Sequence, residues 1–479
     1  MLMHQTAISL PVVLPEAVLA AGTLALVLYG ALRGERGAAV VNEIAVGLLG
    51  VVVILMVAKN RSMGVTFYGS FVDDAFTRFM SALALLGSLV TLLLSAEFMR
   101  QERVGGFEFP VLILISTLGM LMLISANDFI ALYLGFELMS LALYVIAAYR
   151  RHDLRATEAG LKYFVLGALS SGMMLYGISL VYGYSGSVSF AAVANAVHDH
   201  ASIGVLFGLV FVLVGLAFKI SIVPFHMWTP DVYEGAPTPV TTFFATGPKI
   251  AAMAVLVRVM ITAFPGIAND WRQIITFVSI ASMALGAFAA IGQRNFKRLM
   301  AYSSIGHMGF ALVGLAAGTV EGAQSVIIYM AIYLVMTLGT FAAILSMRRS
   351  GRAVETMADL AGLARTDPTM AFFLATMMFS LAGVPPLAGF FAKFYVFAAA
   401  IKAGLYGLSV IGVLASAVGA YYYLRIVKFM YFDEPAPAFD RPSAVARIVL
   451  AVSALMIILF VFAPSPITNA AMAAAQSLF

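Results

Sequence analysis

Long apolar stretches, separated by short polar connectors, make up nearly the whole of this 479-residue chain. A helix needs about 20 mainly apolar residues to cross the hydrocarbon core of a bilayer, and stretches of this length recur throughout the sequence. The pattern predicts an all-α polytopic membrane protein with about 14 transmembrane helices and no soluble domain between them. The expected spans, numbered 1 to 14 in chain order, are residues 10–32, 41–58, 74–98, 109–125, 127–149, 157–183, 202–228, 240–263, 273–292, 298–317, 323–347, 369–402, 404–431 and 444–463.

The composition agrees with lipid as the solvent and limits the chemistry of the chain. Hydrophobic residues are 62% of the sequence and charged residues 11%, an apolar content far above the needs of a soluble core. Because the chain contains no cysteine, it carries no disulfide, thiol nucleophile or thiolate-ligated Fe–S cluster. No strands are expected, so no glycine-rich nucleotide loop follows a strand. Any redox chemistry is expected in partner proteins.

Basic residues are divided very unequally between the connectors. Of the 28 lysines and arginines, 18 lie in or near the connectors that follow odd-numbered spans, and 4 lie in or near those that follow even-numbered spans. Connectors rich in Lys and Arg stay in the cytoplasm, so this split predicts cytoplasmic odd-numbered connectors and both termini outside. The net charge of +5 follows from the same asymmetry, and no basic and aromatic surface typical of nucleic-acid binding accompanies it.

Four ionisable residues lie well inside predicted spans: Glu137, Lys219, Lys249 and Lys393. A charge near the bilayer centre costs about 2.5–3.5 kcal/mol on insertion scales, so such residues normally face a protein or water-filled interior and have a function there. Lys249 lies ten residues into its span. This places it about 15 Å deep, too far for its side chain to reach the interface comfortably. The four residues suggest a route for protons or ions, and structural pairing without function is the alternative interpretation.

Three other basic residues, Arg78, Lys162 and Arg258, lie near the ends of spans. Long basic side chains in such positions reach the membrane interface. Lys162 also follows Glu158 by one helical turn, a spacing at which opposite charges pair. We interpret all three residues as interface anchors or as members of local ion pairs.

Helix-breaking sequences accompany two of the buried lysines. Pro224 follows Lys219 in the segment Lys-Ile-Ser-Ile-Val-Pro, and residues 383–389, Gly-Val-Pro-Pro-Leu-Ala-Gly, precede Lys393. Proline removes an amide donor and clashes with the preceding turn, so helices 7 and 12 are predicted to be broken. Broken helices are tolerated at membrane depth where protein or a wet cavity satisfies the freed backbone groups, and their ends are favoured ion sites.

The positions of the two breaks indicate an internal repeat. Helix 7 is the fourth of helices 4–8, and helix 12 is the fourth of helices 9–13. Two consecutive units of five helices have opposite orientations in the membrane, as in inverted-repeat transporters. The expected division is residues 1–108 for helices 1–3, 109–263 for the first repeat, 264–432 for the inverted second repeat and 433–479 for helix 14.

Histidine and tryptophan residues give less definite signals. His307 lies midway along helix 10, where it is either a relay between the lysines of helices 8 and 12 or a hydrogen-bonded histidine of the helix bundle. His226 lies either at a proton entrance or simply at the interface, and we favour the interfacial interpretation; Trp228 and Trp271 are interpreted as interface anchors. The sequence His-Asp-His at residues 198–200 has no partnering ligands elsewhere, so no metal site is expected there.

Three segments resemble motifs of a known family. Residues 226–240, His-Met-Trp-Thr-Pro-Asp-Val-Tyr-Glu-Gly-Ala-Pro-Thr-Pro-Val, are similar to the helix 7–8 region of subunit N of bacterial NADH:quinone oxidoreductase, respiratory complex I. Residues 301–310 and 381–390 are similar to motifs that are shared with the sibling subunits L and M and with multisubunit cation/proton antiporters. The resemblance covers essentially the whole chain. It favours the N branch, because the L pattern adds a long lateral helix and the M pattern has a glutamate where Lys393 stands.

The resemblance implies a proton-translocating, antiporter-like subunit of complex I in the bacterial inner membrane, with both termini in the periplasm. It assigns the proton path to Glu137, Lys219, Lys249 and Lys393, with His307 as a candidate relay. It implies no cofactor in this chain, and places NADH, FMN, Fe–S clusters and quinone in partner subunits. The implied partners are the other membrane subunits of complex I, the hydrophilic redox arm reached through them, and the lipid bilayer.

Two other classes of function stay open on the sequence. A cation/proton antiporter subunit of the Mrp type, or the sibling subunit M, would share Lys219, Lys249 and the broken helices. A structural membrane subunit with vestigial charges is the third class. In a conducting protein, a nearby carboxylate favours the charged form of a buried lysine, so a change in the separation of Glu137 and Lys219 is expected to load or unload a proton.

Overall fold

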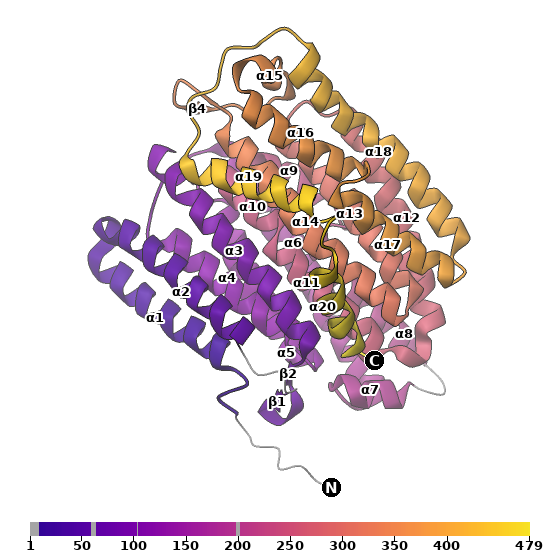
Figure 1. Ribbon diagram of the computed structural model, residues 1–479. Helices are drawn as coiled ribbons and strands as arrows, with labels where there is room; N and C mark the ends of the chain where they lie inside the picture. The colour runs from indigo at the N-terminus through magenta and orange to yellow at the C-terminus, as the bar shows by residue number, and fades with distance from the viewer. Residues whose placement is uncertain (1–8, 59–63, 103, 198–201) are drawn as a thin grey trace.

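The computed structural model describes residues 9–58, 64–102, 104–197 and 202–479, and these residues are mostly helical (Figure 1). A π-helical turn, Val259–Ala263, extends α11. The helices are α1 Leu14–Arg33, α2 Ala38–Ala58, α3 Ala75–Glu102, α4 Glu108–Ile124, α5 Phe129–Ala147, α6 Leu154–Ser185, α7 Phe190–Ala196, α8 Ile203–Ile220, α9 Trp228–Gly235, α10 Thr238–Ala245, α11 Gly247–Arg258, α12 Ala268–Ile291, α13 Phe296–Ala317, α14 Val320–Ser346, α15 Leu363–Thr366, α16 Pro368–Ala382, α17 Ala388–Lys402, α18 Tyr406–Phe432, α19 Ala444–Leu459 and α20 Ser465–Gln476.

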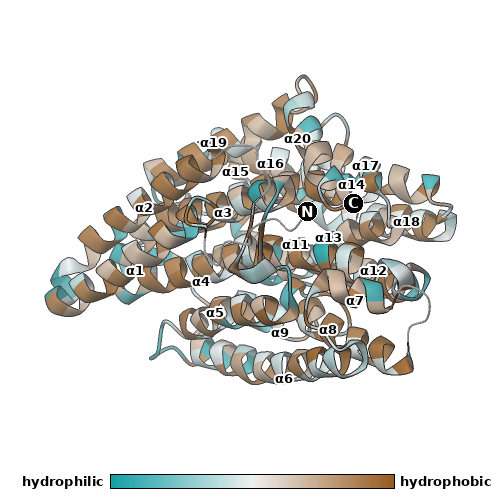
Figure 2. Cartoon of the chain, turned by 90° about the horizontal axis from the view of Figure 1, so that it is seen from below, coloured by the Kyte–Doolittle hydropathy of each residue, from teal (hydrophilic) through white to brown (hydrophobic). Residues whose placement is uncertain are grey.

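Fourteen membrane spans can be recognised among the described residues. Ten helical stretches there are long and apolar enough to cross a membrane, and the first of them contains both α1 and α2. Three shorter apolar helices, α4, α16 and α19, complete the set. Figure 2 shows the hydrophobic residues, in brown, that predominate along these helices. The predicted all-α membrane fold is confirmed, and its helix ends differ from the expected bounds by a few residues. The division into two repeat units at residues 263 and 432 stays a prediction.

Two short antiparallel strand pairs occur in connectors, so the expectation of a chain without strands is wrong there. β1 Gly64–Thr66 pairs with β2 Phe71–Asp73, and β3 Arg348–Arg349 pairs with β4 Arg352–Ala353. Each strand has only two or three residues. The pairs lie between spans, where backbone groups that leave a helix need other hydrogen-bond partners.

Helices 7 and 12 are broken where the prolines predict it. Helix 7 consists of α8 and α9, with residues 221–227 between them, and helix 12 consists of α16 and α17, with residues 383–387 between them. Pro224 and the Pro-Pro pair lie inside these two segments. The breaks leave backbone amides and carbonyls without helical partners inside the bundle, and other groups have to satisfy them.

Side chains supply hydrogen bonds to backbone groups at both breaks. The Trp228 indole N–H donates to the Phe218 carbonyl at 2.9 Å, and the Gly389 amide donates to Ser380 Oγ at 3.0 Å. Trp228 and Trp271 are each only 2% exposed, so their interpretation as interface anchors is wrong. Trp228 closes the first break instead, because its indole N–H needs a buried acceptor and the broken helix supplies one.

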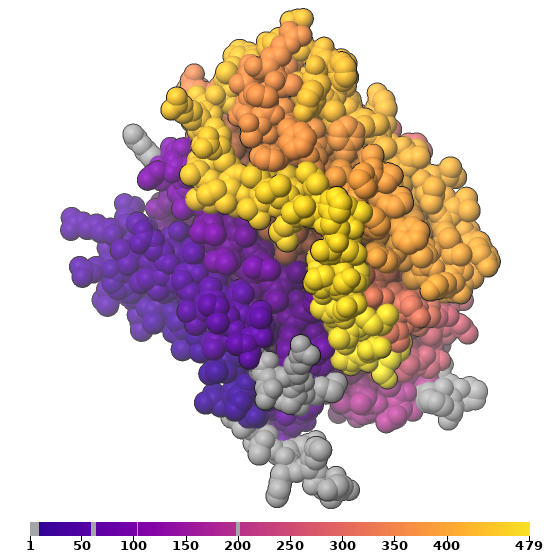
Figure 3. Space-filling view, viewed as in Figure 1, coloured from indigo at the N-terminus to yellow at the C-terminus, as the bar shows by residue number. Residues whose placement is uncertain are grey.

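Two helical features are absent from the sequence prediction. Helix 8 is divided at Thr246 into α10 and α11, three residues before Lys249, and the Gly-Pro pair at residues 247–248 is the signal for this division. Helix 14 continues beyond α19 as α20, which packs against α3 and α14. Figure 3 shows these two helices, in yellow, lying across the face of the molecule between the purple N-terminal helices and the orange helices of the second half.

The first and last described segments of the chain lie at the same end of the bundle. The Ser9 amide donates to Thr66 Oγ1 at 2.8 Å, and the Phe76 amide donates to Ser477 Oγ at 3.1 Å. Thr66 and Phe76 belong to one short segment around the β1–β2 pair. An even number of membrane crossings produces this arrangement.

α12 and α13 approach each other too closely for side chains at their crossing. A Cβ atom at Gly286 would lie 2.6 Å from the backbone of Gly306, and one at Gly309 would lie 2.9 Å from Met283. These separations are shorter than real Cβ contacts, so only glycine fits. The register of the two helices is therefore fixed by contact between their backbones, and α13 is buried along most of its length.

A buried ion pair joins α3 to the end of α11. Arg258 Nη1 lies 2.8 Å from Asp74 Oδ2 and Nη2 lies 3.0 Å from Oδ1, with both side chains at most 3% exposed. Arg258 also donates to Thr77 Oγ1 at 2.9 Å. The interpretation of Arg258 as an interface anchor or local pair is wrong, because its partner lies 184 residues away along the chain.

Asp74→Asn should lower the thermal stability of the protein. The substitution leaves the Arg258 guanidinium buried without its counter-charge, and removing one partner of a buried ion pair costs about 3–5 kcal/mol. Glu434→Gln is the matched control, because the Arg365–Glu434 pair is exposed and its loss should change little. The measurement is the melting temperature in detergent. An unchanged melting temperature for Asp74→Asn would contradict the role given to this pair.

Candidate functional site

All five residues singled out by the sequence lie in the helical bundle at or near its interior. Lys219 is in the last turn of α8, Lys249 in the first turn of α11, His307 in the middle of α13 and Lys393 in α17. These four side chains are between 0% and 7% exposed. Glu137, on α5, is only partly buried. Each of the three lysines lies close to an interruption of its own helix.

Glu137 faces α6 and is not paired with a lysine. Its carboxylate accepts a hydrogen bond from Ser171 Oγ. Among the described residues, no ion pair within 4.0 Å joins Glu137 to Lys219. The adjacent residue, Phe136, lies against that lysine, with its ring centre 5.0 Å from Lys219 Nζ. The structure therefore brings the two charges into one region without pairing them.

Lys219 is enclosed by aromatic rings. Its ammonium donates to Tyr163 Oη at 3.3 Å. It lies 5.0–5.2 Å from the ring centres of Phe136, Tyr144 and Tyr163. Such contacts stabilise an ammonium without placing a counter-charge beside it. Tyr163 stacks in turn on Trp228 of α9, with ring centres 4.4 Å apart and planes inclined by 19°.

Lys249 has hydroxyl groups and an aromatic ring as its neighbours. Its ammonium donates to Ser304 Oγ on α13, and Ser304 shares a hydrogen bond of 2.8 Å with Tyr333 Oη on α14. The ring centre of Tyr233 lies 5.3 Å from the ammonium. Among the described residues, no carboxylate lies within 4.0 Å of the Lys249 ammonium, so no permanent counter-ion fixes its charge.

His307 is one helical turn from Ser304 and is hydrogen-bonded through both ring nitrogens. Nδ1 lies 2.7 Å from Tyr329 Oη, and Nε2 lies 3.1 Å from Tyr423 Oη. Tyr423 is also hydrogen-bonded to Ser303 Oγ. A histidine between two hydroxyls exchanges donor and acceptor roles when its tautomer changes. These bonds agree with a structural histidine of the bundle, and they also supply the partners that a relay needs.

Lys393 is held by the broken end of α16. Its ammonium donates to the carbonyl oxygens of Leu381 at 3.2 Å and Ala382 at 2.9 Å, and to Ser416 Oγ at 2.8 Å. These carbonyls are free C-terminal acceptors of α16, whose partial negative charge favours a cation. A cavity of about 10 Å³ lies against both Lys393 and His307. This volume is enough for about one water molecule.

The sequence pattern does not predict most of the hydrogen-bond and ring partners of the charged residues. Tyr163, Tyr233 and Tyr423 come from three different helices, and hydroxyl residues carry no distinctive spacing in an apolar sequence. Ser304 is the exception, because it precedes His307 by three positions and so lies on the same face of α13. That spacing is a usable signal for a serine that links Lys249 to the histidine.

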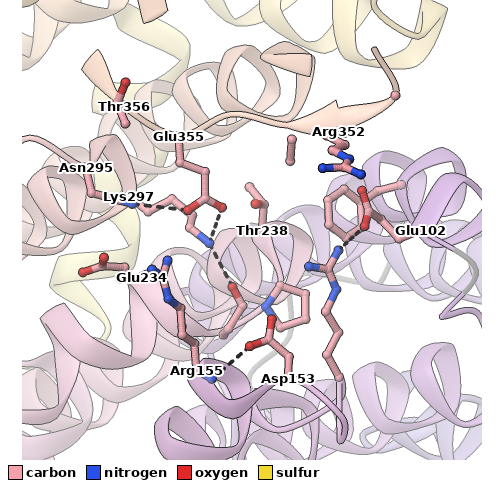
Figure 4. A pocket seen from close by; sticks show the side chains of 17 residues that line it. Glu102, Asp153, Arg155, Glu234, Thr238, Asn295, Lys297, Arg352, Glu355 and Thr356 are labelled. Carbon is pink, nitrogen blue, oxygen red and sulfur yellow. Dashed lines mark hydrogen bonds and ion pairs between the residues drawn. The ribbon is translucent and has the colours of Figure 1, made fainter. Parts of the chain in front are cut away.

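A polar cavity of about 460 Å³ lies at one end of the bundle (Figure 4). Segments that follow spans 3, 5, 7, 9 and 11 all line it, so it belongs to the end that carries most of the basic connectors. Lys297 is only 3% exposed and places its ammonium 2.7 Å from Glu355 Oε1 and 3.1 Å from the Ala236 carbonyl. Thr238, the first residue of α10, also lines the cavity, which therefore reaches the helix that leads to Lys249.

Metal binding has no support among the described residues. Within those ranges, no group of three or more histidine, cysteine or carboxylate side chains is placed to hold a metal ion. The His-Asp-His sequence at residues 198–200 lies outside the described residues. His226 is partly buried in the break between α8 and α9, and its interfacial position stays a prediction.

These features define a class of membrane protein. Buried lysines beside broken helices, with hydroxyl partners inside a bundle, are typical of membrane proteins that move protons or ions. Residues 126–419 match the transmembrane family of NADH:quinone oxidoreductase and Mrp antiporters. A chain of respiratory complex I from Thermus thermophilus has a TM-score of 0.83 and 34% identity, covering 95% of this chain and 98% of that chain. A chain of the Mrp complex from Dietzia sp. has a TM-score of 0.86 at 21% identity, covering 98% of each, a likeness that shows the fold alone.

Sequence relatives narrow the class further. NADH-quinone oxidoreductase subunit N of Beijerinckia indica is 66% identical over 98% of this chain and 99% of its own length. Subunit N 1 of Rhizobium meliloti is 58% identical over 98% of each chain. The chain belongs to the NADH-quinone oxidoreductase subunit N family. The resemblance to the N branch is confirmed.

The small cavity between Lys393 and His307 should hold one ordered water molecule. Both residues are polar, the cavity has room for about one water, and Ser416 and Tyr423 supply further hydrogen-bonding groups on its wall. A map of the intact complex that resolves internal waters should show a peak within hydrogen-bonding distance of Lys393 Nζ. A map of that quality without such a peak would contradict the expected water bridge.

Proposed function

We propose that this chain is a proton-translocating membrane subunit of a bacterial NADH:quinone oxidoreductase, driven by electron transfer in other subunits. The observation that carries the proposal is the series of polar groups inside the bundle that runs from the partly buried Glu137 on α5 to the buried Lys393 on α17. Lys219, Lys249 and His307 lie along this series, and each is hydrogen-bonded to a hydroxyl group. Membership of the subunit N family supports the assignment to such a complex.

Neutral partners suit a residue that has to change its charge. A buried lysine paired with a carboxylate keeps its proton, whereas one surrounded by hydroxyls, carbonyls and rings gains or loses it as nearby charges move. Glu137 is the nearby charge for Lys219, and its movement toward or away from Lys219 loads or unloads that lysine. Protons then pass through hydroxyls and water from Lys249 by way of His307 to Lys393.

The redox steps belong to partner subunits in this proposal. Other membrane subunits adjoin the chain, and through them it responds to a hydrophilic arm where NADH, FMN, Fe–S clusters and quinone react. The absence of cysteine from the sequence agrees with this division of labour, because Fe–S clusters are held by cysteine thiolates. The chain contributes proton transfer to the enzyme and takes no electron.

A cation/proton antiporter of the Mrp type is the second candidate. It is favoured by the family match, which includes Mrp antiporters as well as NADH:quinone oxidoreductase. The buried lysines and broken helices would serve either function, so the two functions are distinguished by the proteins with which the chain assembles. Co-purification with soluble redox subunits supports the first candidate, and co-purification with antiporter subunits alone supports the second.

Lys249→Ala should reduce proton uptake coupled to NADH oxidation by roughly tenfold or more, because it removes the central proton-binding group of the series. The measurement is proton uptake by inverted membrane vesicles per NADH oxidised, with assembly of the complex checked separately. Lys402→Ala is the matched control, because Lys402 is exposed at the end of α17. If fully assembled Lys249→Ala complex pumps like the control, the lysine is structural and the proposed path is wrong.

The proposed orientation places both termini in the periplasm and the 460 Å³ cavity on the cytoplasmic side. Because the chain has no cysteine, single cysteines report sidedness without background labelling. A cysteine added after Phe479 should react with a membrane-impermeant thiol reagent in intact spheroplasts, whereas Ser350→Cys should react only in inverted vesicles. The reverse labelling pattern would show that the 18 to 4 division of basic residues does not set the orientation.

A further inference from the structure

α9 is an eight-residue helix that contacts the surroundings of both Lys219 and Lys249. Trp228, at its start, stacks on Tyr163, the hydrogen-bond partner of Lys219. Tyr233, in the following turn, places its ring centre 5.3 Å from the Lys249 ammonium. Trp228 and Tyr233 also meet edge to face, with ring centres 6.4 Å apart. One short helix therefore lies between the two lysine pockets and forms part of each.

The inner face of α9 carries two buried hydroxyl groups. Thr229 and Tyr233 are four positions apart, so they lie on the same face of the helix. Both side chains are 0% exposed, and neither hydroxyl has a hydrogen-bond partner within 3.5 Å among the described residues. Ser221, two residues after Lys219, has a third buried hydroxyl of this kind. Buried hydroxyls nearly always have a partner, so these three groups point to ordered water between the two lysines.

The indole of Trp228 is unsuited to carry protons across this gap. Its N–H is donated to the Phe218 carbonyl, and an indole offers no acceptor atom. A hydroxyl both accepts and donates a hydrogen bond, which is the property a relay requires. The hydroxyls of Thr229 and Tyr233 are therefore the groups on α9 that can join the pocket of Lys219 to that of Lys249.

The outer face of α9 is fixed by ion pairs to two other helices. Asp231, on the opposite side of the helix from the two hydroxyls, lies 2.7 Å from Lys162 Nζ on α6 and 2.7 Å from Arg298 Nη1 on α13. Glu234 adds a contact of 3.1 Å to Arg298. Lys162 also forms the predicted pair with Glu158, at 2.6 Å. Asp231 thus ties α9 to the helices that carry Tyr163 and Ser304.

We propose that Tyr233, together with Thr229, is the hydroxyl link that passes protons between Lys219 and Lys249, and that Asp231 is the positioning residue that holds this link in place. The inference rests on the proposed function of proton translocation. In the transfer, Lys219 gives one proton to water, and each hydroxyl accepts a proton on its oxygen while its own proton moves on. Lys249 receives one proton, and the hydroxyls end as they began.

Tyr233→Phe tests the link, because it keeps the ring beside Lys249 and removes only the hydroxyl. In assembled complex, this variant should lower the rate of NADH-driven proton uptake by roughly tenfold. Thr229→Val, which replaces a hydroxyl by a methyl group of similar size, should also lower it. Tyr182→Phe is the control, because the side chain of Tyr182 is exposed on α6. Wild-type pumping rates in assembled Tyr233→Phe complex would overturn the proposal.

Lys249→Ala, measured in parallel, separates this inference from the proposed function. If Lys249→Ala stops pumping and Tyr233→Phe does not change it, protons reach Lys249 without the hydroxyl and only the link is wrong. If Lys249→Ala also pumps normally, the function itself is wrong. A loss in both variants, with the Tyr182→Phe control unchanged, supports both.

Asp231→Asn tests the positioning role by readouts that a general loss of stability would not produce. It should increase hydrogen–deuterium exchange of the backbone amides in residues 228–235 and slow proton uptake, whereas Asp231→Glu should restore both. In the Tyr233→Phe background, Asp231→Asn should cause little further loss, because Asp231 acts through that hydroxyl. An equal fold-loss in both backgrounds, or unchanged exchange in α9, would overturn its role as a positioning residue.

Discussion

The lipid core offers no hydrogen-bond partner, so each polar group at depth has to find one inside the bundle. At the interruptions of helices 7 and 12, the side chains of Trp228 and Ser380 supply hydrogen bonds to backbone groups beside the breaks. The same requirement governs the lysines. Lys393 takes the carbonyls of Leu381 and Ala382, which the second break has released. A broken helix leaves buried carbonyl groups without hydrogen-bond donors, which costs free energy. The same carbonyls are ligands for a cation, and a bound cation offsets that cost. Buried charge and irregular backbone therefore occur together in this chain.

Two kinds of buried charge coexist in the protein, and their partners distinguish them. Asp74 and Arg258 neutralise each other through two hydrogen bonds and join α3 to α11. The ammonium of Lys249 has a serine hydroxyl and a tyrosine ring as its neighbours, and no carboxylate of the described residues lies within 4.0 Å. A charge with a fixed counter-ion holds helices together. A change in its protonation would leave the buried partner without a counter-charge, which costs free energy. A charge among neutral dipoles changes with less penalty, and this makes it suitable for transfer.

The sequence predicts the elements whose cause is local and misses those whose cause is tertiary. Apolar length predicts the spans, and proline predicts the two breaks, because both act within a few residues of the chain. The hydroxyl partners of the lysines are different, since Tyr163 reaches Lys219 from 56 positions away and Ser304 reaches Lys249 from 55. Trp228 lies beside polar residues in the sequence and so has the pattern of an interfacial residue, although it folds into the core. The Gly-Pro pair before Lys249 is a local signal for the division of helix 8, whereas α20 begins between two prolines and its alanine-rich sequence is less apolar than that of a span.

The backbone contact between α12 and α13 has a mechanical consequence. Gly286 and Gly306 leave no side chain between the helices, and a close-packed interior resists sliding. Ser304 and His307 lie within one turn of that contact, so α13 holds them at fixed heights in the membrane. α13 is therefore a rigid support, and the displacements that switch a charge have to come from side chains, internal water and short segments such as residues 383–387. The close contact at Gly286 and Gly306 thus makes α12 and α13 the rigid part of the protein, against which smaller segments move.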